Sequence, residues 1–200
     1  MSAADPVLCL ASASPRRRDL LHQIGVPHLV VPAAIDETQR DGELPPDYAL
    51  RMAREKALHV ARLDAARGLA VLGADTVVVA RGRVLGKPRD RNDAAAMLEL
   101  LSGAAHAVTS AVALVTGDRV DARLSESEVR FRATTAAERA AYCATREPLD
   151  KAGGYAVQGF AAVFVAAIRG SYSGVMGLPL FETAQLLRAA GIPYWVGSHA

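Results

Sequence analysis

Apolar residues follow two kinds of spacing along the chain, and the alternation of these spacings predicts a fold that mixes helices and strands. Short apolar runs, typical of buried strands, lie at residues 7–11, 28–31, 70–80 and 162–168. Capping residues and helical spacing of apolar residues predict helices at residues 15–24, 47–66, 92–101, 135–145 and 180–190.

Two further runs, residues 107–116 and 120–132, flank Gly117-Asp118 and predict a β-hairpin. In the second run Val129 and Phe131 alternate with charged residues, so we expect one face of that strand to be wet. Helices and strands alternate, but the hairpin is antiparallel. The predicted fold class is therefore α/β with a mixed sheet, in one unit without repeats or linkers.

Composition narrows the function classes. The chain has 200 residues, of which 51% are hydrophobic, and 23 basic against 21 acidic side chains give a net charge of +2. Such a chain is too apolar for a disordered protein. Its densest basic cluster, residues 16–18, has no aromatic neighbours and suits a small anion better than nucleic acid.

Cysteine usage and apolar run lengths predict the compartment. Cys9 and Cys143 form no disulfide or zinc pattern, and Cys9 is expected in the core. The longest apolar run, residues 160–168, is half the length of a membrane span, and the N-terminus does not resemble a secretory signal. We therefore expect a cytoplasmic protein that binds neither nucleic acid nor membrane.

Asp75 is the first candidate for chemistry because it interrupts an apolar strand. An unpaired carboxylate there would cost several kcal/mol, so a metal ion, a cationic partner or a raised pKa must offset it. The alternative is an aspartate at a strand end that accepts hydrogen bonds from backbone amides. Gly73, two residues earlier, is expected to leave room for a ligand beside the carboxylate.

A second candidate site is the turn between the first strand and the first helix. It contains Ser12 and Ser14, and the helix begins with Pro15, Arg16 and Arg17. A helix N-terminus with guanidinium groups in its first turn favours phosphate oxygens. Ser14 is expected to cap that helix and Pro15 to occupy its first position. A solvated basic helix start would account for the same residues.

Two lysines have alternative interpretations. Lys56 lies on the apolar stripe of the 47–66 helix, with residues 49, 52, 60 and 63. Either its ammonium reaches water along a packed stem, or it binds phosphate. Lys87 lies between Gly86 and Pro88, where it is either a rigidly held ligand or an ordinary turn residue.

Two loops add weaker candidates. Asp36 and Glu37 lie in a polar loop after a strand, where metal ligands occur but surface acids are also common. Gln158, in a loop rich in glycine, has an amide that can pair with a base edge. Gly170, Gly174 and Gly177 are expected in a turn or mobile loop before the last helix.

In this order, the segments resemble the Maf family of nucleoside triphosphate pyrophosphatases over almost the whole chain. The matching motifs are LASASPRRRDLL (10–21), IDET (35–38), REKA (54–57), VLGADTVV (71–78), GKPRD (86–90), LSG (101–103), EPLDKAGGYAVQG (147–159) and GSYSGVMGLPL (170–180). The resemblance implies one domain over residues 1–200, with a mixed, twisted sheet flanked by helices and two lobes around a central cleft. It also implies a homodimer.

The resemblance implies hydrolysis of a nucleoside triphosphate to the monophosphate and pyrophosphate, with a divalent cation, Mg²⁺ or Mn²⁺. Asp75 would be the catalytic acidic residue and a metal ligand, and Glu37 a second catalytic and metal-binding acidic residue. Lys87 would be a catalytic basic residue that binds phosphate. Substrate-binding positions match Ser12, Ser14, Arg16, Arg17, Lys56, Thr76 and Gln158.

Three of these positions imply substrate choice. Arg16, Thr76 and Gln158 resemble the branch that hydrolyses dTTP and UTP, whereas the 7-methyl-GTP branch tends to have Trp, Gln and Glu there. The implied role is removal of unwanted nucleotides, with a link to cell-division arrest. The alternatives are a nucleotide-binding regulator of septum formation without catalysis, or a relative that prefers 7-methyl-GTP.

Overall fold

The computed structural model describes residues 5–196, and these residues fall into two compact units. The first comprises residues up to 75, residues 110–125 and residues from 177 onward, and the second comprises residues 76–109 and 126–176. No helix among the described residues is long and apolar enough to span a membrane.

The strands are β1 (Leu8–Leu10), β2 (His28–Val30), β3 (Ala70–Ala80), β4 (Arg83–Leu85), β5 (Ala105–Thr116), β6 (Arg119–Phe131) and β7 (Val165–Arg169). The α-helices are α1 (Pro15–Gln23), α2 (Pro45–Ala61), α3 (Arg91–Leu101), α4 (Ala136–Ala144), α5 (Tyr172–Met176) and α6 (Leu180–Ala189). Short 3-10 helices are η1 (Asp64–Ala66), η2 (Glu147–Asp150), η3 (Ala152–Gly154) and η4 (Phe160–Phe164).

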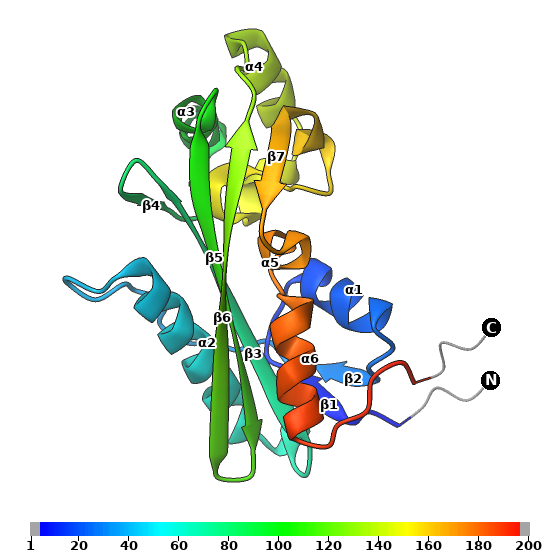
Figure 1. Ribbon diagram of the computed structural model, residues 1–200. Helices are drawn as coiled ribbons and strands as arrows, with labels where there is room; N and C mark the ends of the chain where they lie inside the picture. The colour runs from blue at the N-terminus through cyan, green and yellow to red at the C-terminus, as the bar shows by residue number, and fades with distance from the viewer. Residues whose placement is uncertain (1–4, 197–200) are drawn as a thin grey trace. The chain divides into compact units, whose positions relative to one another are not determined.

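The strands form a seven-stranded mixed sheet in the order β2-β1-β3-β5-β6-β7, with β4 paired to β3 (Figure 1). β1 is parallel to β2 and to β3, in a register that places Leu10 opposite Val30 and Leu72. β4 and β7 are antiparallel to their neighbours. The α/β class with a mixed sheet is confirmed.

In the first unit, α2 covers one face of the sheet and α1 and α6 lie on the other (Figure 1). β1 is wholly buried, so Cys9 belongs to the core as predicted. The chain after α6 returns to α1, where the backbone N–H of Trp195 donates to the Ile24 carbonyl at 2.7 Å. α1 and α6 are thereby joined at their ends.

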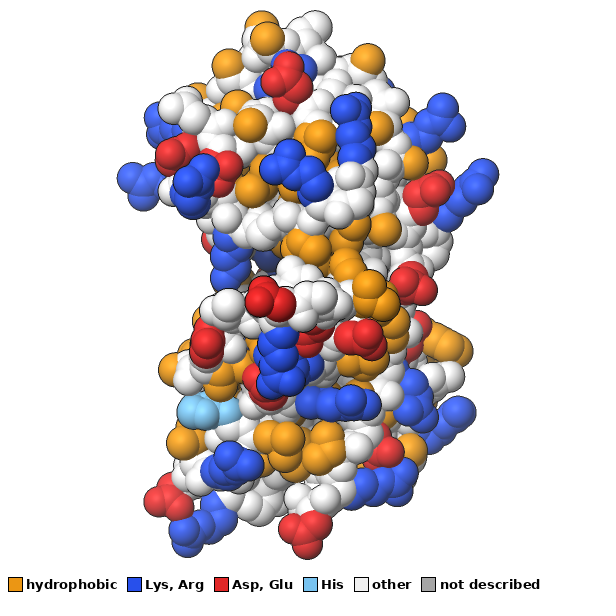
Figure 2. All heavy atoms as spheres, turned by 90° about the vertical axis from the view of Figure 1, so that its left-hand side faces the viewer, with side chains coloured by type: hydrophobic (Ala, Val, Ile, Leu, Met, Phe, Trp, Pro, Cys, Tyr) orange, Lys and Arg blue, Asp and Glu red, His pale blue; other side chains and the backbone are white. Residues whose placement is uncertain are grey.

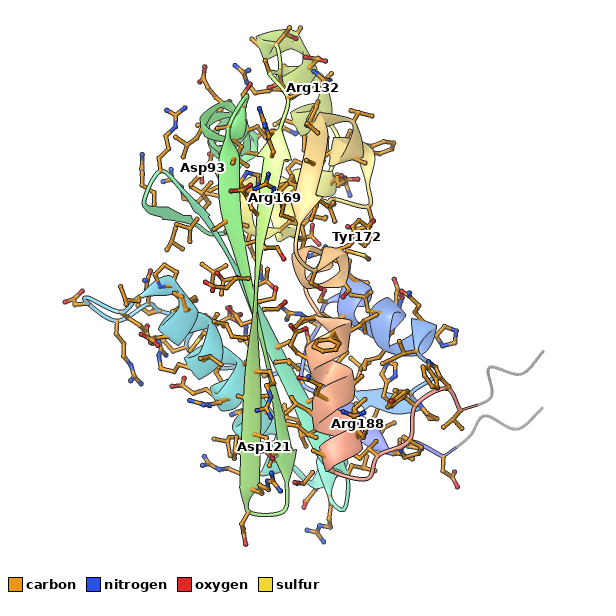
Figure 3. The ribbon with its side chains drawn as sticks, in the orientation of Figure 1. Asp93, Asp121, Arg132, Arg169, Tyr172 and Arg188 are labelled. Carbon is orange, nitrogen blue, oxygen red and sulfur yellow. The ribbon has the colours of Figure 1, made fainter. Side chains whose placement is uncertain are left out.

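The core of the second unit combines aliphatic side chains with a group of aromatic rings. The ring of Phe131 makes edge-to-face contacts with His106 and Tyr155, at centroid distances of 5.2 and 4.9 Å. α3 packs against α4, whose start is closed by a capping box between Thr135 and Glu138. Figure 3 shows Arg132 at the end of β6, where its guanidinium bonds Glu138 at 2.7 Å.

Most predicted elements are confirmed, including the hairpin, the wet face of β6 and all five long helices. The prediction for residues 47–66 was too long, because Leu63 is extended (φ −86°, ψ 142°) and separates α2 from η1. Leu63 was expected on the buried stripe, but it is 38% exposed.

Three short elements differ from the predictions. Residues 160–164 are the 3-10 helix η4, so the strand predicted at 162–168 is confirmed only from Val165. The strand β4 and the helix α5, within the expected glycine-containing loop, were not predicted. Elements of three to five residues are too short to show a period in the sequence.

Candidate active site

The close packing of α2 on β3 sets the position of Asp75. A Cβ built on Gly73 would lie 2.2 Å from the Ala53 carbonyl oxygen and 2.8 Å from the Ala57 amide nitrogen. The expectation that Gly73 leaves room for a ligand was therefore wrong, because α2 fills that space. The glycine instead lets the helix backbone approach the strand, and Lys56 lies in the helical turn that makes the contact.

Lys56 forms a buried ion pair with Asp75. Its Nζ donates to Oδ1 of Asp75 at 2.7 Å, and both side chains are 9% exposed. The same Nζ lies 3.1 Å from Oε1 of Glu37, whose side chain is 47% exposed. The lysine thus holds one buried and one accessible carboxylate. Of the two alternatives considered for Lys56, the one in which its ammonium reaches water does not hold, and binding of phosphate stays a prediction.

Burial raises the pKa of Asp75, because loss of water disfavours the charged carboxylate. The positive charges of Lys56 and Arg17 act in the opposite direction. Of the explanations predicted for a buried carboxylate, the structure therefore supports two: a cationic partner and a raised pKa. Because burial and the two positive charges act on the pKa in opposite directions, a change in the charges nearby can make this carboxyl group bind or release a proton.

Residues 12–17 form a tight turn into α1. The Ser12 hydroxyl oxygen accepts from the Ser14 amide at 3.2 Å and from Nη1 of Arg17 at 3.1 Å. Nε of Arg17 also donates to the Gly177 carbonyl at 2.7 Å, which joins the turn to the segment before α6. Ser14 is the N-cap residue as predicted, although its side chain makes no capping bond.

Arg17 lies near enough to Asp75 and Glu37 to interact with both carboxylates electrostatically. The charges of Asp75 and Glu37 favour its protonated form, whereas burial lowers its pKa. Arg16 directly precedes Arg17 in the same helical turn and is half-buried. The first unit therefore brings Asp75, Glu37 and Lys56 together with Arg17 and, through Arg17, with Ser12.

The three other predicted residues belong to the second unit. Lys87 and Gln158 are exposed, and their loops are linked because the Gly153 amide donates to the Gly86 carbonyl at 3.0 Å. Thr76 follows Asp75 directly in β3, and alternation along the strand turns its side chain to the opposite face.

Sequence reasoning missed the residues that support the Glu37 loop, which we define as residues 36–44. Tyr48 and Arg51, both on α2, bond carbonyl oxygens of this loop, and Arg51 also pairs with Glu43. The sequence indicated this role only weakly, because Arg51 and Glu55 have the i, i+4 spacing of an ordinary ion pair on a helix surface.

A divalent cation fits the chemistry of this group of acids. No cluster of three His, Cys, Asp or Glu side chains that could hold a metal occurs within residues 5–196. However, Mg²⁺ is usually bound by one or two carboxylates together with waters and substrate phosphates. Asp75 and Glu37, which share the Lys56 ammonium, supply two such carboxylates.

Comparison with known proteins extends over nearly the whole chain. The model of the family described as "Maf-like protein" matches residues 7–190. A protein of Bordetella avium is 55% identical over 194 residues, covering 94% of this chain and 96% of its own length. Proteins of Saccharophagus degradans and Alcanivorax borkumensis are 50% and 51% identical, each over 94% of this chain and over 90% and 98% of their own lengths. All three are named dTTP/UTP pyrophosphatase.

Proposed function

This chain belongs to the Maf family, and we propose that it hydrolyses dTTP and UTP to the nucleoside monophosphate and pyrophosphate. The observation that carries the proposal is the buried Asp75–Lys56 pair, with Glu37 on the same ammonium and Arg17 close by. About half of all positions are also identical in relatives named for this activity. Removal of unwanted nucleotides is the role that we infer for it.

The basic groups suit a polyphosphate. Arg16 and Arg17 in the first turn of α1 offer guanidinium forks to phosphate oxygens, and the amide end of the helix adds positive potential. Ser12 fixes the turn and Arg17, while Ser14 remains a predicted contact of the substrate. Catalysis of this kind rests mainly on positioning and charge stabilisation.

Asp75 and Glu37 would hold a divalent cation, Mg²⁺ or Mn²⁺. Such an ion neutralises phosphate charge and makes a bound water more acidic. Asp75, whose pKa burial raises, is suited to accept a proton from the attacking water. Lys56 favours the charged form of Asp75, also contacts Glu37, and is expected to turn towards phosphate when the substrate arrives.

In the second unit, Lys87 is proposed as a further catalytic cation, and Thr76 and Gln158, with Arg16 of the first unit, as the determinants of base choice. Exposure leaves Lys87 and Gln158 accessible to a ligand. On the face shown in Figure 2, basic and acidic side chains are interspersed, which favours a small substrate over nucleic acid. A single domain, a homodimer and a cytoplasmic location also stay predictions.

The test is hydrolysis by the purified protein with MgCl₂ or MnCl₂, and pyrophosphate release is the measurement. We expect dTTP and UTP to be hydrolysed faster than CTP and 7-methyl-GTP. Asp75→Asn should lower turnover by about 10²- to 10⁴-fold, the usual contribution of a proton-transfer group. Wild-type turnover in this variant would refute the catalytic assignment, and preference for 7-methyl-GTP would refute the assignment of substrate.

Asp121 provides a matched control. It is also a strand aspartate of the first unit and pairs with a basic side chain, since its Oδ2 lies 2.6 Å from Nε of Arg119. Figure 3 shows it on β6. Asp121→Asn should keep wild-type turnover. The loss of turnover in Asp75→Asn would then be specific to Asp75 and not a general effect of removing a carboxylate from a strand.

A further inference from the structure

Glu37 needs support that its own side chain does not supply. It lies in a segment without helix or strand between β2 and α2. The 3.1 Å contact of its half-exposed side chain with Lys56 is worth little, because water screens such ion pairs. Ordering a free loop residue costs conformational entropy, so a flexible loop would weaken whatever Glu37 binds.

Arg51 supplies that support from α2. Its Nε and Nη2 donate to the two carboxylate oxygens of Glu43, at 2.6 and 2.7 Å. The side chains of Arg51 and Glu43 are only 14% and 10% exposed. Two-point pairing of this kind fixes direction as well as distance. The far end of the Glu37 loop is thereby held on the helix.

The same guanidinium also holds the near end of the loop. Nη2 of Arg51 donates to the carbonyl of Thr38, the residue after Glu37, at 3.1 Å. The hydroxyl of Tyr48 donates to the carbonyl of Glu37 itself at 2.7 Å, and the Arg51 guanidinium lies over the Tyr48 ring, 5.5 Å from its centroid. The two contacts therefore hold the backbone at Glu37 itself and at Thr38, the next residue.

Helix α2 therefore carries the lysine that contacts Glu37 and the residues that hold its loop. Tyr48, Arg51 and Lys56 are parts of one regular helix, so their spacing does not depend on the loop. Arg51 keeps the pKa of Glu43 low, at about 2, and the pair stays charged at neutral pH. The hold is consequently present under physiological conditions.

We propose that Arg51 is a positioning residue that, through Glu43 and the Thr38 carbonyl, fixes the Glu37 loop so that Glu37 lies beside Lys56 and Asp75. The inference rests on the proposed function, in which Glu37 is a metal-binding acid. Arg51 does not itself touch the reacting atoms in the proposed reaction and acts only through the loop. Its loss should weaken cation binding rather than change the chemistry at Asp75.

The central comparison is Arg51→Met against Arg40→Met. Arg40 is a matched control because it lies in the same loop and its side chain is 68% exposed; within residues 5–196 its guanidinium makes only a 3.4 Å contact, with Glu55. Removal of a group that orients a metal ligand typically weakens metal affinity 10- to 100-fold. We expect a shift of at least about 10-fold for Arg51→Met and less than about 2-fold for Arg40→Met.

Two measurements report this shift. One is the Mn²⁺ concentration that gives half-maximal hydrolysis of dTTP, where kcat at saturating Mn²⁺ should fall less than the affinity. The other is direct Mn²⁺ binding by electron paramagnetic resonance, with a non-hydrolysable dTTP analogue present. Arg51→Lys should give an intermediate result, because an ammonium cannot make the two-point contact with Glu43.

A double-mutant cycle with Glu37→Gln separates positioning from general stability. If Arg51 acts through Glu37, Arg51→Met should add almost nothing in the Glu37→Gln background. An equal loss in both backgrounds would overturn the proposal, and so would unchanged cation binding in Arg51→Met. Wild-type behaviour of Glu37→Gln would overturn it as well, since Arg51 would then have nothing to position.

Hydrogen exchange of the Glu37 loop, measured on each full-length variant without substrate, keeps the proposal separate from the proposed function. Arg51→Met should speed exchange of residues 36–44, and Arg40→Met should not. Wild-type exchange in Arg51→Met would overturn the proposal even in an active enzyme. Failure of the wild type to hydrolyse dTTP and UTP would instead refute the function. Should Arg51→Met not fold, Glu43→Gln should show the same changes to a smaller extent.

Discussion

At the scale of single residues, the site depends on one buried pair of opposite charges. Neither Asp75 nor Lys56 would be stable alone at 9% side-chain exposure, because desolvation costs several kcal/mol for each ion. Their opposite charges offset part of that cost, and Glu37, whose side chain is 47% exposed, contacts the same ammonium. The pair therefore couples the stability of the first unit to its proposed chemistry.

Lys56→Met should destabilise the protein by about 3–5 kcal/mol, the cost of leaving one member of a buried pair without its partner. The pKa of Asp75, already raised by burial, should rise further once this ammonium is gone. The free energy of unfolding, measured by urea denaturation at pH 7, reports the loss. Hydrolysis of dTTP should fall in the same variant.

The double variant Lys56→Met, Asp75→Asn serves as the control for this prediction. It removes both charges, so it should be more stable than Lys56→Met alone, although it should remain inactive. If Lys56→Met were as stable as the wild type, the ion pair would contribute nothing to folding and the interpretation of Asp75 would fail.

At the scale of elements, the contact between α2 and β3 aligns the groups of the site. Gly73 allows the helix backbone to approach the strand, and this closeness brings Lys56 to Asp75. Tyr48 and Arg51 on the same helix hold the Glu37 loop. One helix–strand contact therefore positions both acids and the lysine.

Gly73→Ala should be strongly destabilising, because its Cβ would overlap the Ala53 carbonyl oxygen at 2.2 Å and the helix would have to move. Overpacking of this kind costs about 1–3 kcal/mol or more, and displacement of Lys56 should also reduce hydrolysis. Thermal unfolding and turnover measure the two effects. Gly86→Ala is the control for stability, since its Cβ would meet nothing within 4 Å. Equal melting temperatures of the two variants would contradict this account of the contact.

The sequence predicted the long elements and the main acids, and physical reasons explain what it did not predict. Asp75 was recognisable because a carboxylate in an apolar strand requires a partner. The partner itself, Lys56, was ambiguous, since a lysine on a buried stripe fits a phosphate ligand as well as a packed stem, and the ion pair with Asp75 was not foreseen. Gly73 was misinterpreted because the sequence does not show whether a helix or a ligand fills the space above a glycine. Arg51 was missed because its contacts depend on the path of a loop.

At the scale of the whole molecule, stability at acid pH depends on ionisable groups in both units. His106, in the core of the second unit, is buried with Nε2 2.8 Å from the Tyr155 hydroxyl, and its Nδ1 has no hydrogen-bond partner among the described residues. Burial lowers its pKa from 6.5 to about 4. Arg51 and Arg132 lower the pKa values of Glu43 and Glu138 from 4.5 to about 2.

These shifts predict two successive losses of stability as the pH falls. The folded state resists protonation of His106, so stability is complete above about pH 6.5 and decreases towards pH 4, by about 2–3 kcal/mol. Glu43 and Glu138 contribute stability that is present above pH 4.5 and is lost as the pH falls through about 2. Urea denaturation across this range measures both steps.

His106→Gln, which keeps a polar group but cannot titrate, should remove the upper step and leave the lower one. Parallel profiles of this variant and the wild type between pH 6.5 and 4 would show that folding does not lower the pKa of His106.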